Sequence, residues 1–218
     1  MIKILGKIPN PVYLAVSGGI DSMTILHFLL QGKREVIPCF FDHGTETSKK
    51  ARTFLTSLLG SSLKIGEIEG ERNKEDSLEE FWRNERYSFF NQFPHIVTCH
   101  HLDDVIETWL FSSMNGNPKL MQYRSVKRIH PFLLTTKADI ESYAKRHDIK
   151  YSVDMSNFDR HFPRNRIRHE IMPHVLEINP GIHKTIARKV KQKYVEQEQW
   201  FKEVIGDFLE ECLKENEV

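Results

Sequence analysis

Residues 17–22, with the sequence SGGIDS, have the side-chain types and the setting needed to bind an anion. They join a short apolar run, 12–16, to an apolar-periodic segment, 23–30, that predicts a helix. Adjacent glycines let a backbone approach a ligand closely, serines add hydroxyl donors, and a first helical turn offers unpaired N–H groups. The pattern predicts a phosphate site; a plain strand-to-helix turn capped by serine and aspartate is the simpler alternative.

Asp21 stands at the start of that helix, where its carboxylate would repel a bare phosphate. A divalent cation between the carboxylate and the phosphate oxygens removes this repulsion, so we expect Mg²⁺ to accompany the nucleotide. The Walker pattern GxxxxGK[ST] does not occur in the sequence. Chemistry at a γ-phosphate is therefore not the first expectation.

A second group of reactive side chains lies in residues 100–108, HHLDDVIET, directly after the apolar run 96–99. Asp104 and Glu107 are three residues apart, which places both carboxylates on one face of a helix near its start. Two close carboxylates can bind a cation, receive a proton or hold an ammonium group. Zinc binding by the two histidines is an alternative, but adjacent histidines point apart and neither has an i, i+4 histidine partner.

The elements that must position these residues predict an α/β fold. The run 35–41 is continuously apolar, as is typical of a strand buried on both faces of a parallel sheet. We expect a mostly parallel, twisted sheet with helices on both faces, followed by a C-terminal helical appendage. The expected strands are 12–16, 35–41, 63–68, 96–99 and about 129–133, and the expected helices include 47–59, 77–92 and 182–212.

Length, composition and cysteine usage narrow the class of protein. A chain of 218 residues with 39% hydrophobic content can bury one substantial core. Its three cysteines, Cys39, Cys99 and Cys212, are far apart and odd in number, which favours reduced thiols over a disulfide framework or a metal site. No run approaches the roughly 20 apolar residues of a membrane span. These features predict a soluble, cytoplasmic protein with no membrane partner, and they leave the oligomeric state open.

The net charge of +1 conceals a basic region. Between residues 119 and 169 there are 12 lysines and arginines against 5 aspartates and glutamates, so the rest of the chain is acidic. A local basic surface on an otherwise acidic protein is typical of a polyanion-binding protein, although a solvated face of mixed charge is the alternative.

Four short segments of the chain resemble the signature motifs of a known family. SGGIDS resembles the SGGxDS signature of the PP-loop (N-type) ATP pyrophosphatases, which cleave ATP between the α- and β-phosphates and adenylate a substrate. The segments at 42–44, 83–87 and 100–108 resemble the VDHG, RxxRY and HHLDDxxET motifs of one PP-loop branch, the tRNA(Ile)-lysidine synthases. Weaker matches are RPLL at 130–134, DxSN within 151–157 and RNRIR at 164–168, and the resemblance covers roughly residues 10 to 180.

The resemblance implies a ligase that uses ATP and Mg²⁺ to join free L-lysine to the wobble cytidine of tRNA(Ile). It implies ATP-binding residues Ser17, Gly18, Gly19, Ile20, Asp21, Ser22, Asp42 and His43. It implies catalytic residues Asp21, Asp104, Glu107 and Arg83, with Asp21 also holding Mg²⁺, and tRNA-binding residues Arg86, Lys127, Arg128, Arg164, Arg166 and Arg168.

Residues 1–150 are then expected to form the ATP-binding catalytic domain, and 151–218 a basic loop and helical segment. Full-length lysidine synthases usually continue into further tRNA-contacting domains, so this chain is expected to be a short form. Two alternatives remain: a PP-loop tRNA thiolase, and a truncated, non-catalytic nucleotide- or RNA-binding module. The arginines also have a simpler interpretation, as members of surface ion pairs. Arg83 and Arg86 could pair with Glu79 or Glu80. The arginines at 164–168 could pair with Glu170 and Asp159.

Overall fold

The computed structural model of the chain describes residues 1–72, 75, 77–125, 127–153, 160 and 162–215; at residue 79 and at 205–215 it describes the backbone alone. The stretch that matches the DxSN motif, residues 154–157, lies outside the described residues.

Five parallel strands form one sheet in the order β3-β2-β1-β4-β5. The chain first adds strands on one side of β1 and then returns to add β4 and β5 on the other side, so β1 and β4 form the point where the strand order reverses. The predicted parallel α/β fold is confirmed. The strands are β1 (Val12–Ala15), β2 (Val36–Asp42), β3 (Lys64–Glu67), β4 (Ile96–Val97) and β5 (Arg128–Ile129).

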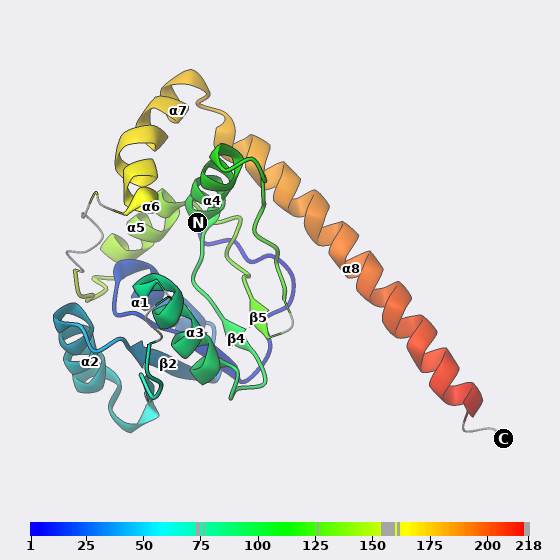
Figure 1. The fold of residues 1–218 in the computed structure, drawn as a ribbon, viewed down its shortest axis with the longest axis horizontal. Helices are drawn as coiled ribbons and strands as arrows, with labels where there is room; N and C mark the ends of the chain where they lie inside the picture. The colour runs from blue at the N-terminus through cyan, green and yellow to red at the C-terminus, as the bar shows by residue number, and fades with distance from the viewer. Residues whose placement is uncertain (73–74, 76, 126, 154–159, 161, 216–218) are drawn as a thin grey trace.

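Helices connect and cover the strands (Figure 1). Ser77, the first residue of the helix expected over 77–92, caps α3 by accepting the Glu80 N–H. The helices are α1 (Ile20–Gln31), α2 (Glu46–Leu59), α3 (Leu78–Phe90), α4 (Leu102–Met114), α5 (Lys137–Arg146), α6 (Pro163–Arg166), α7 (Met172–Ile178) and α8 (Ile182–Glu215), with a 3₁₀ turn at η1 (Gly60–Ser62) and a π-helical turn at η3 (Ile167–Ile171).

The alternating side chains of β1 divide the core between the two faces of the sheet. Val12 and Leu14 join the larger apolar cluster, which includes buried residues of α1, α2 and α4. Tyr13 and Ala15 pack against the smaller cluster formed by Cys39, Phe90 and Ile96, which α3 covers. Helices therefore cover both faces, because successive strand residues point to opposite sides.

The predicted last strand is shorter than the expected 129–133. Pairing ends at Ile129, and the next residues turn, with the Thr135 N–H donating to the Phe132 carbonyl at 2.8 Å. Pro131 has no N–H for the ladder, while Phe132 and Leu133 are fully buried and fill the core instead. The expectation of a strand over 130–133 was therefore wrong.

The C-terminal helix α8 begins in the body and then leaves it. Ile182, Ile186 and Val190 are buried, and this part of the helix packs on α4. Farther along, Trp200 is 56% exposed, and Figure 1 shows the helix running well beyond the sheet. Among the described residues, none of the helices, α8 included, combines the length and the apolar character needed to cross a membrane.

Candidate active site

The two reactive segments meet where the strand order reverses. SGGIDS follows β1, HHLDD follows β4, and the two strands are parallel neighbours. In open α/β sheets, ligands bind in the crevice beyond the carboxyl ends of the strands at such a reversal. The fold therefore places both segments at one candidate site.

The loop after β1 is shaped for close approach to its backbone. Gly18 has φ +81°, a conformation that side-chain-bearing residues rarely adopt, and its carbonyl accepts the Ser152 N–H at 2.8 Å. Helix α1 begins next to Gly19, and no side chain caps its first turn. Ser17 and Ser22 bring their hydroxyls within 3.3 Å of each other across the loop. The Ser22 hydroxyl already donates to the Gly19 carbonyl at 3.0 Å, so it would have to turn to reach a ligand. The uncapped N–H groups and the Ser17 hydroxyl are suitable donors for phosphate oxygens.

Asp21 faces a cation that the sequence analysis missed. The Lys137 ammonium donates to Asp21 Oδ1 at 2.6 Å, and His101 Nε2 lies 3.7 Å from the same oxygen. The lysine comes from the first turn of α5, far away in the chain. In the sequence Lys137 simply follows the N-cap Thr136, so nothing local distinguishes it from an ordinary helix start.

The carboxylates fit a magnesium ion only if phosphate supplies most of its ligands. No group of three or more histidine, cysteine, aspartate or glutamate side chains within the described part of the chain could hold a metal ion. Mg²⁺ is commonly bound by one or two carboxylates together with substrate phosphates and water. Asp21 meets that requirement, as a single carboxylate beside a phosphate-binding loop.

Asp104 and Glu107 lie together, and a single guanidinium joins them. Arg168 donates from Nε to Glu107 Oε1 at 2.7 Å and from Nη2 to Glu107 Oε2 at 2.8 Å, a bidentate pair. Its Nη2 also lies 3.2 Å from Asp104 Oδ1. Asp104 Oδ2 accepts the His101 N–H at 2.9 Å, which caps α4. The predicted proximity of the two carboxylates is thus present, but Arg168 already engages both.

Burial and neighbouring charges drive the two carboxyl pKa values apart. Burial alone would raise the pKa of Asp104, but His101, His100, the His101 N–H and Arg168 together lower it. Burial raises the pKa of Glu107, and Arg168 only partly offsets the shift. Glu107 is therefore the better proton acceptor of the two.

A third carboxylate, Asp103, ties the site to the C-terminal half. Its Oδ2 accepts the backbone N–H of Lys137 at 2.7 Å, and its Oδ1 lies 3.0 Å from His183 Nε2 of α8. The sequence analysis gave Asp103 no role. The structure makes it the residue that places the start of α5 beside the loop after β1.

The two adjacent histidines point to different neighbours. His101 is buried next to Asp21 and Asp104, whereas His100 Nδ1 lies 2.8 Å from Thr98 Oγ1 and 3.4 Å from His130 Nδ1. Burial lowers the pKa of His130 to about 3, and it also lowers that of His100. This histidine pair is therefore held neutral.

Asp42 and His43 are bonded within their own turn. Asp42 Oδ1 accepts the Ser48 hydroxyl at 2.7 Å and the Gly44 N–H at 2.9 Å, while the His43 N–H donates to Ser48 Oγ at 3.0 Å. Burial lowers the pKa of His43 to about 4. Their contact with ATP stays a prediction, and the His43 N–H would have to leave Ser48 to take part.

The arginines expected to contact RNA or substrate lie in three settings. Arg83 and Arg128 stack on Tyr87 at 4.7 and 4.2 Å from the ring centre, and Arg86 lies 5.7 Å away. Burial, with the nearby Arg83 and Arg128, lowers the pKa of Arg86. Arg83, Arg86 and Arg128 therefore form a positive cluster around Tyr87. The ion pair expected with Glu79 involves a side chain outside those that the structure describes.

The remaining residues that were predicted to contact RNA have different bonding partners. Lys127 Nζ donates to the Asn91 carbonyl at 2.7 Å. Arg166 pairs with Glu170 at 3.4 Å, as the ion-pair alternative expects, and Arg168 faces the two carboxylates of α4. Arg164 is placed close enough to His100 to lower the pKa of that histidine. The three arginines of 164–168 therefore have different neighbours, and their RNA role stays a prediction.

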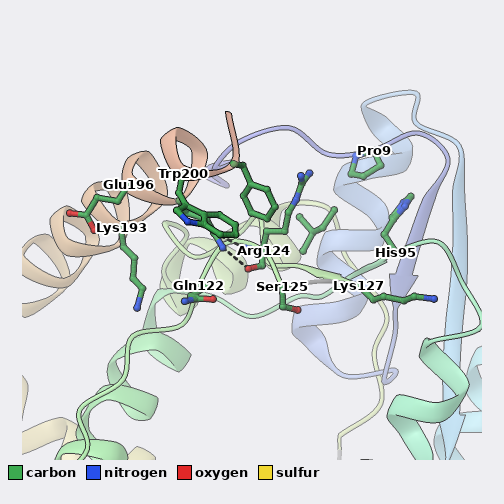
Figure 2. Close-up of a pocket in the computed structure, with 12 residues that line it drawn as sticks. Pro9, His95, Gln122, Arg124, Ser125, Lys127, Lys193, Glu196 and Trp200 are labelled. Atoms are coloured by element: carbon green, nitrogen blue, oxygen red, sulfur yellow. Dashed lines mark hydrogen bonds between the residues drawn. The ribbon is translucent and has the colours of Figure 1, made fainter. Parts of the chain in front are cut away.

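A cavity of about 900 Å³ lies away from this site. Pro9, His95 and Lys127 precede β1, β4 and β5, so their side of the cavity is at the amino ends of the strands. Figure 2 shows Trp200 and Lys193 of α8 on the opposite side. The reactive segments occupy the carboxyl ends, so this cavity is separate from the candidate active site.

Comparisons with known proteins agree with the strand-end motifs. The sequence model of the PP-loop domain matches residues 3–175. The tRNA(Ile)-lysidine synthase of Persephonella marina is 33% identical over 195 residues, covering 78% of this chain and 42% of that protein. The same enzyme from Thermotoga maritima is 31% identical over 220 residues, covering 91% and 53%. The chain thus spans about half the length of the curated relatives it matches.

A solved structure is also similar in part. The phosphoadenylyl-sulfate (PAPS) reductase from Candida auris, in a phosphate complex, is 15% identical, with a TM-score of 0.45 over 66% of this chain and 76% of that one.

Proposed function

This chain belongs to the PP-loop domain family, and we propose that it joins lysine to a tRNA cytidine in an ATP-dependent reaction that forms lysidine. The observation that carries the proposal is the convergence of the SGGIDS loop with the Asp104 and Glu107 pair at the β1–β4 reversal. The similarity to tRNA(Ile)-lysidine synthases supports the same reading.

The first step is adenylation of the base. The C2 oxygen of cytidine attacks the α-phosphorus of ATP, a P–O bond forms, and the bond to the β-phosphate breaks to release pyrophosphate. The N–H groups of the first turn of α1 and the hydroxyls of Ser17 and Ser22 hold the departing phosphates. Asp21 would hold Mg²⁺ there, and the ion would supply positive charge against the negative charge that develops on the phosphates.

The second step is amine transfer. The lysine amine forms a C–N bond at C2, and the C–O bond to AMP breaks. Lysine arrives as an ammonium group, so it must be attracted and then deprotonated. Asp103, Asp104 and Glu107 bring three carboxylates to the first turns of α4, and Arg168 pairs with two of them. An additional cation is therefore favourable there, and the raised pKa of Glu107 suits it to take up the proton.

We propose that the positive cluster around Tyr87 binds the tRNA. Arg83, Arg86 and Arg128 gather on this ring, and Arg86 is close enough to His43 to lower the pKa of that histidine at the carboxyl end of β2. Guanidinium groups bind phosphates bidentately and stack on bases. The cluster would therefore anchor the RNA beside the nucleotide, with Arg86 and Arg164 both close to His100, and the catalytic role of Arg83 stays a prediction.

The cysteines weigh against the tRNA thiolase alternative. Burial raises the pKa of Cys39 to about 12 and that of Cys99 still further. A nucleophilic cysteine needs a lowered pKa and access. Of the cysteines whose side chains the structure describes, neither meets that need.

Nucleoside analysis by mass spectrometry tests the proposal. Bulk tRNA is incubated with the protein, ATP and lysine, digested, and searched for a cytidine that has gained lysine with loss of water. Reactions without lysine and with Asp21→Ala are the controls. A second incubation with sulfide in place of lysine supplies the sulfur that a thiolase needs, and a new sulfur-containing nucleoside there would establish the thiolase alternative. Nucleotide binding without a new nucleoside in either incubation would establish the non-catalytic module.

A further inference from the structure

Lys137 is held at the nucleotide loop by two independent contacts. Its ammonium lies 2.6 Å from Asp21 Oδ1, and its backbone N–H donates to Asp103 Oδ2 at 2.7 Å. One contact comes from the helix after β1 and the other from the helix after β4. The residue thus lies at the junction between the two strand ends.

The helix that carries Lys137 is firmly packed. Ile140 and Ala144 of α5 are buried, and Tyr143 lies against Phe28 of α1 with ring centroids 6.0 Å apart. The side chain of Lys137 is nevertheless 33% exposed. A fixed backbone with a partly exposed flexible chain lets the ammonium move by rotamer change while its anchor stays in place.

The charges at the loop after β1 favour a mobile positive group beside it. The uncapped first turn of α1 attracts phosphate, whereas the Asp21 carboxylate in that same turn repels it. The Lys137 ammonium offsets this carboxylate by pairing with Asp21, which itself belongs to the first turn of α1. A lysine acts on phosphate as a point charge and needs no fixed fork geometry.

We infer that Lys137 binds the β- and γ-phosphates of ATP and neutralises the departing pyrophosphate. This inference rests on the proposed use of ATP by the SGGIDS loop. The competing explanation is that Lys137 only fixes Asp21 through a structural ion pair. The two differ in what remains when Asp21 loses its charge.

Equilibrium binding without tRNA separates the two explanations. We would measure the affinities of Mg²⁺-ATP, pyrophosphate and AMP by calorimetry for wild type, Lys137→Met and Lys137→Gln. A lost charge-assisted hydrogen bond should weaken ATP and pyrophosphate about 10- to 100-fold, and AMP less than about 2-fold. The matched control is Lys145→Met, an exposed lysine in the last turn of the same helix, which should bind all three like wild type.

The double variant Asp21→Asn with Lys137→Met completes the test. If Lys137 serves only to offset Asp21, the double variant should regain the ATP affinity of Asp21→Asn alone, and the inference is overturned. Equal losses for AMP and pyrophosphate would also overturn it. Wild-type protein that binds no ATP would refute the proposed function itself, whereas normal ATP binding by Lys137→Met would refute only the inference.

Discussion

Replacing Arg168 tests how far the α4 carboxylates depend on one guanidinium. Arg168→Met removes the bidentate contact with Glu107 and the contact with Asp104. The Glu107 side chain is only 8% exposed, while that of Arg168 is 39% exposed. Removing one partner of a buried pair costs about 3 to 5 kcal/mol, and an exposed pair is worth about 0 to 1. The partial exposure of Arg168 therefore predicts a loss of about 2 kcal/mol at pH 8.

The loss should depend on pH, because Glu107 can take up a proton. Burial raises its pKa in the folded state, and removal of Arg168 raises that pKa further. A carboxyl group whose folded pKa exceeds its unfolded value favours folding below the unfolded pKa and loses this contribution as the pH rises through the folded pKa. The Arg168→Met loss should therefore shrink to under about 1 kcal/mol at pH 5.

Urea unfolding followed by circular dichroism measures both effects. Arg166→Met is the matched control, since Arg166 is exposed and pairs with Glu170 at 3.4 Å; its loss should stay within about 0.5 kcal/mol at both pH values. Adding Glu107→Gln to Arg168→Met should recover stability at pH 8, because the amide carries no charge. An Arg168→Met loss that is the same at pH 5 and pH 8, or a double variant less stable than the single one, would refute this reasoning.

Three further changes address the chemistry and the RNA. Glu107→Gln should still transfer label from the α-phosphate of ATP to tRNA, but with the lysine KM raised about 10- to 150-fold; a variant that labels no tRNA would place Glu107 in the nucleotide site. Asp21→Ala should slow pyrophosphate release by roughly 10²- to 10³-fold with little change in Tm, and an unchanged rate would contradict its assignment. Replacing Arg164 and Arg166 by glutamine should reduce the slope of log K for tRNA against log[salt] by about 0.7 to 0.9 per lost phosphate contact, whereas an unaltered slope would make them structural.

Local sequence patterns were sufficient for the parallel fold. The apolar runs that became β1 and β2 are each followed by turn residues, and the Ser77 cap sets the start of α3 as predicted. Such signals act over one element and its neighbours, so they are legible without the rest of the chain. The last strand was misjudged because Phe132 and Leu133 are equally apolar in a strand or in a buried turn, and Pro131 decides between them.

Only the part of the site that follows the strands directly in sequence could be predicted. Residues 17–22 and Asp104 with Glu107 follow strands, and the edge at which they meet follows from the parallel order. The positions of the cations that face these residues do not follow from the strand order. Lys137 is 116 residues from Asp21, Arg168 is 61 from Glu107, and His183 is 80 from Asp103. No periodicity or spacing encodes contacts at that range, since they depend on how α5, η3 and α8 pack.

These contacts give the carboxylates of α4 two tasks. Asp103 holds the starts of α5 and α8, and Asp104 with Glu107 holds Arg168 in the π-helical turn η3. π-helical turns are rare and are frequently found at functional sites, so the placement of Arg168 in one is consistent with a role in the reaction. Because the same groups bind the C-terminal elements and supply negative charge for an ammonium, a substitution here should alter stability and lysine binding together.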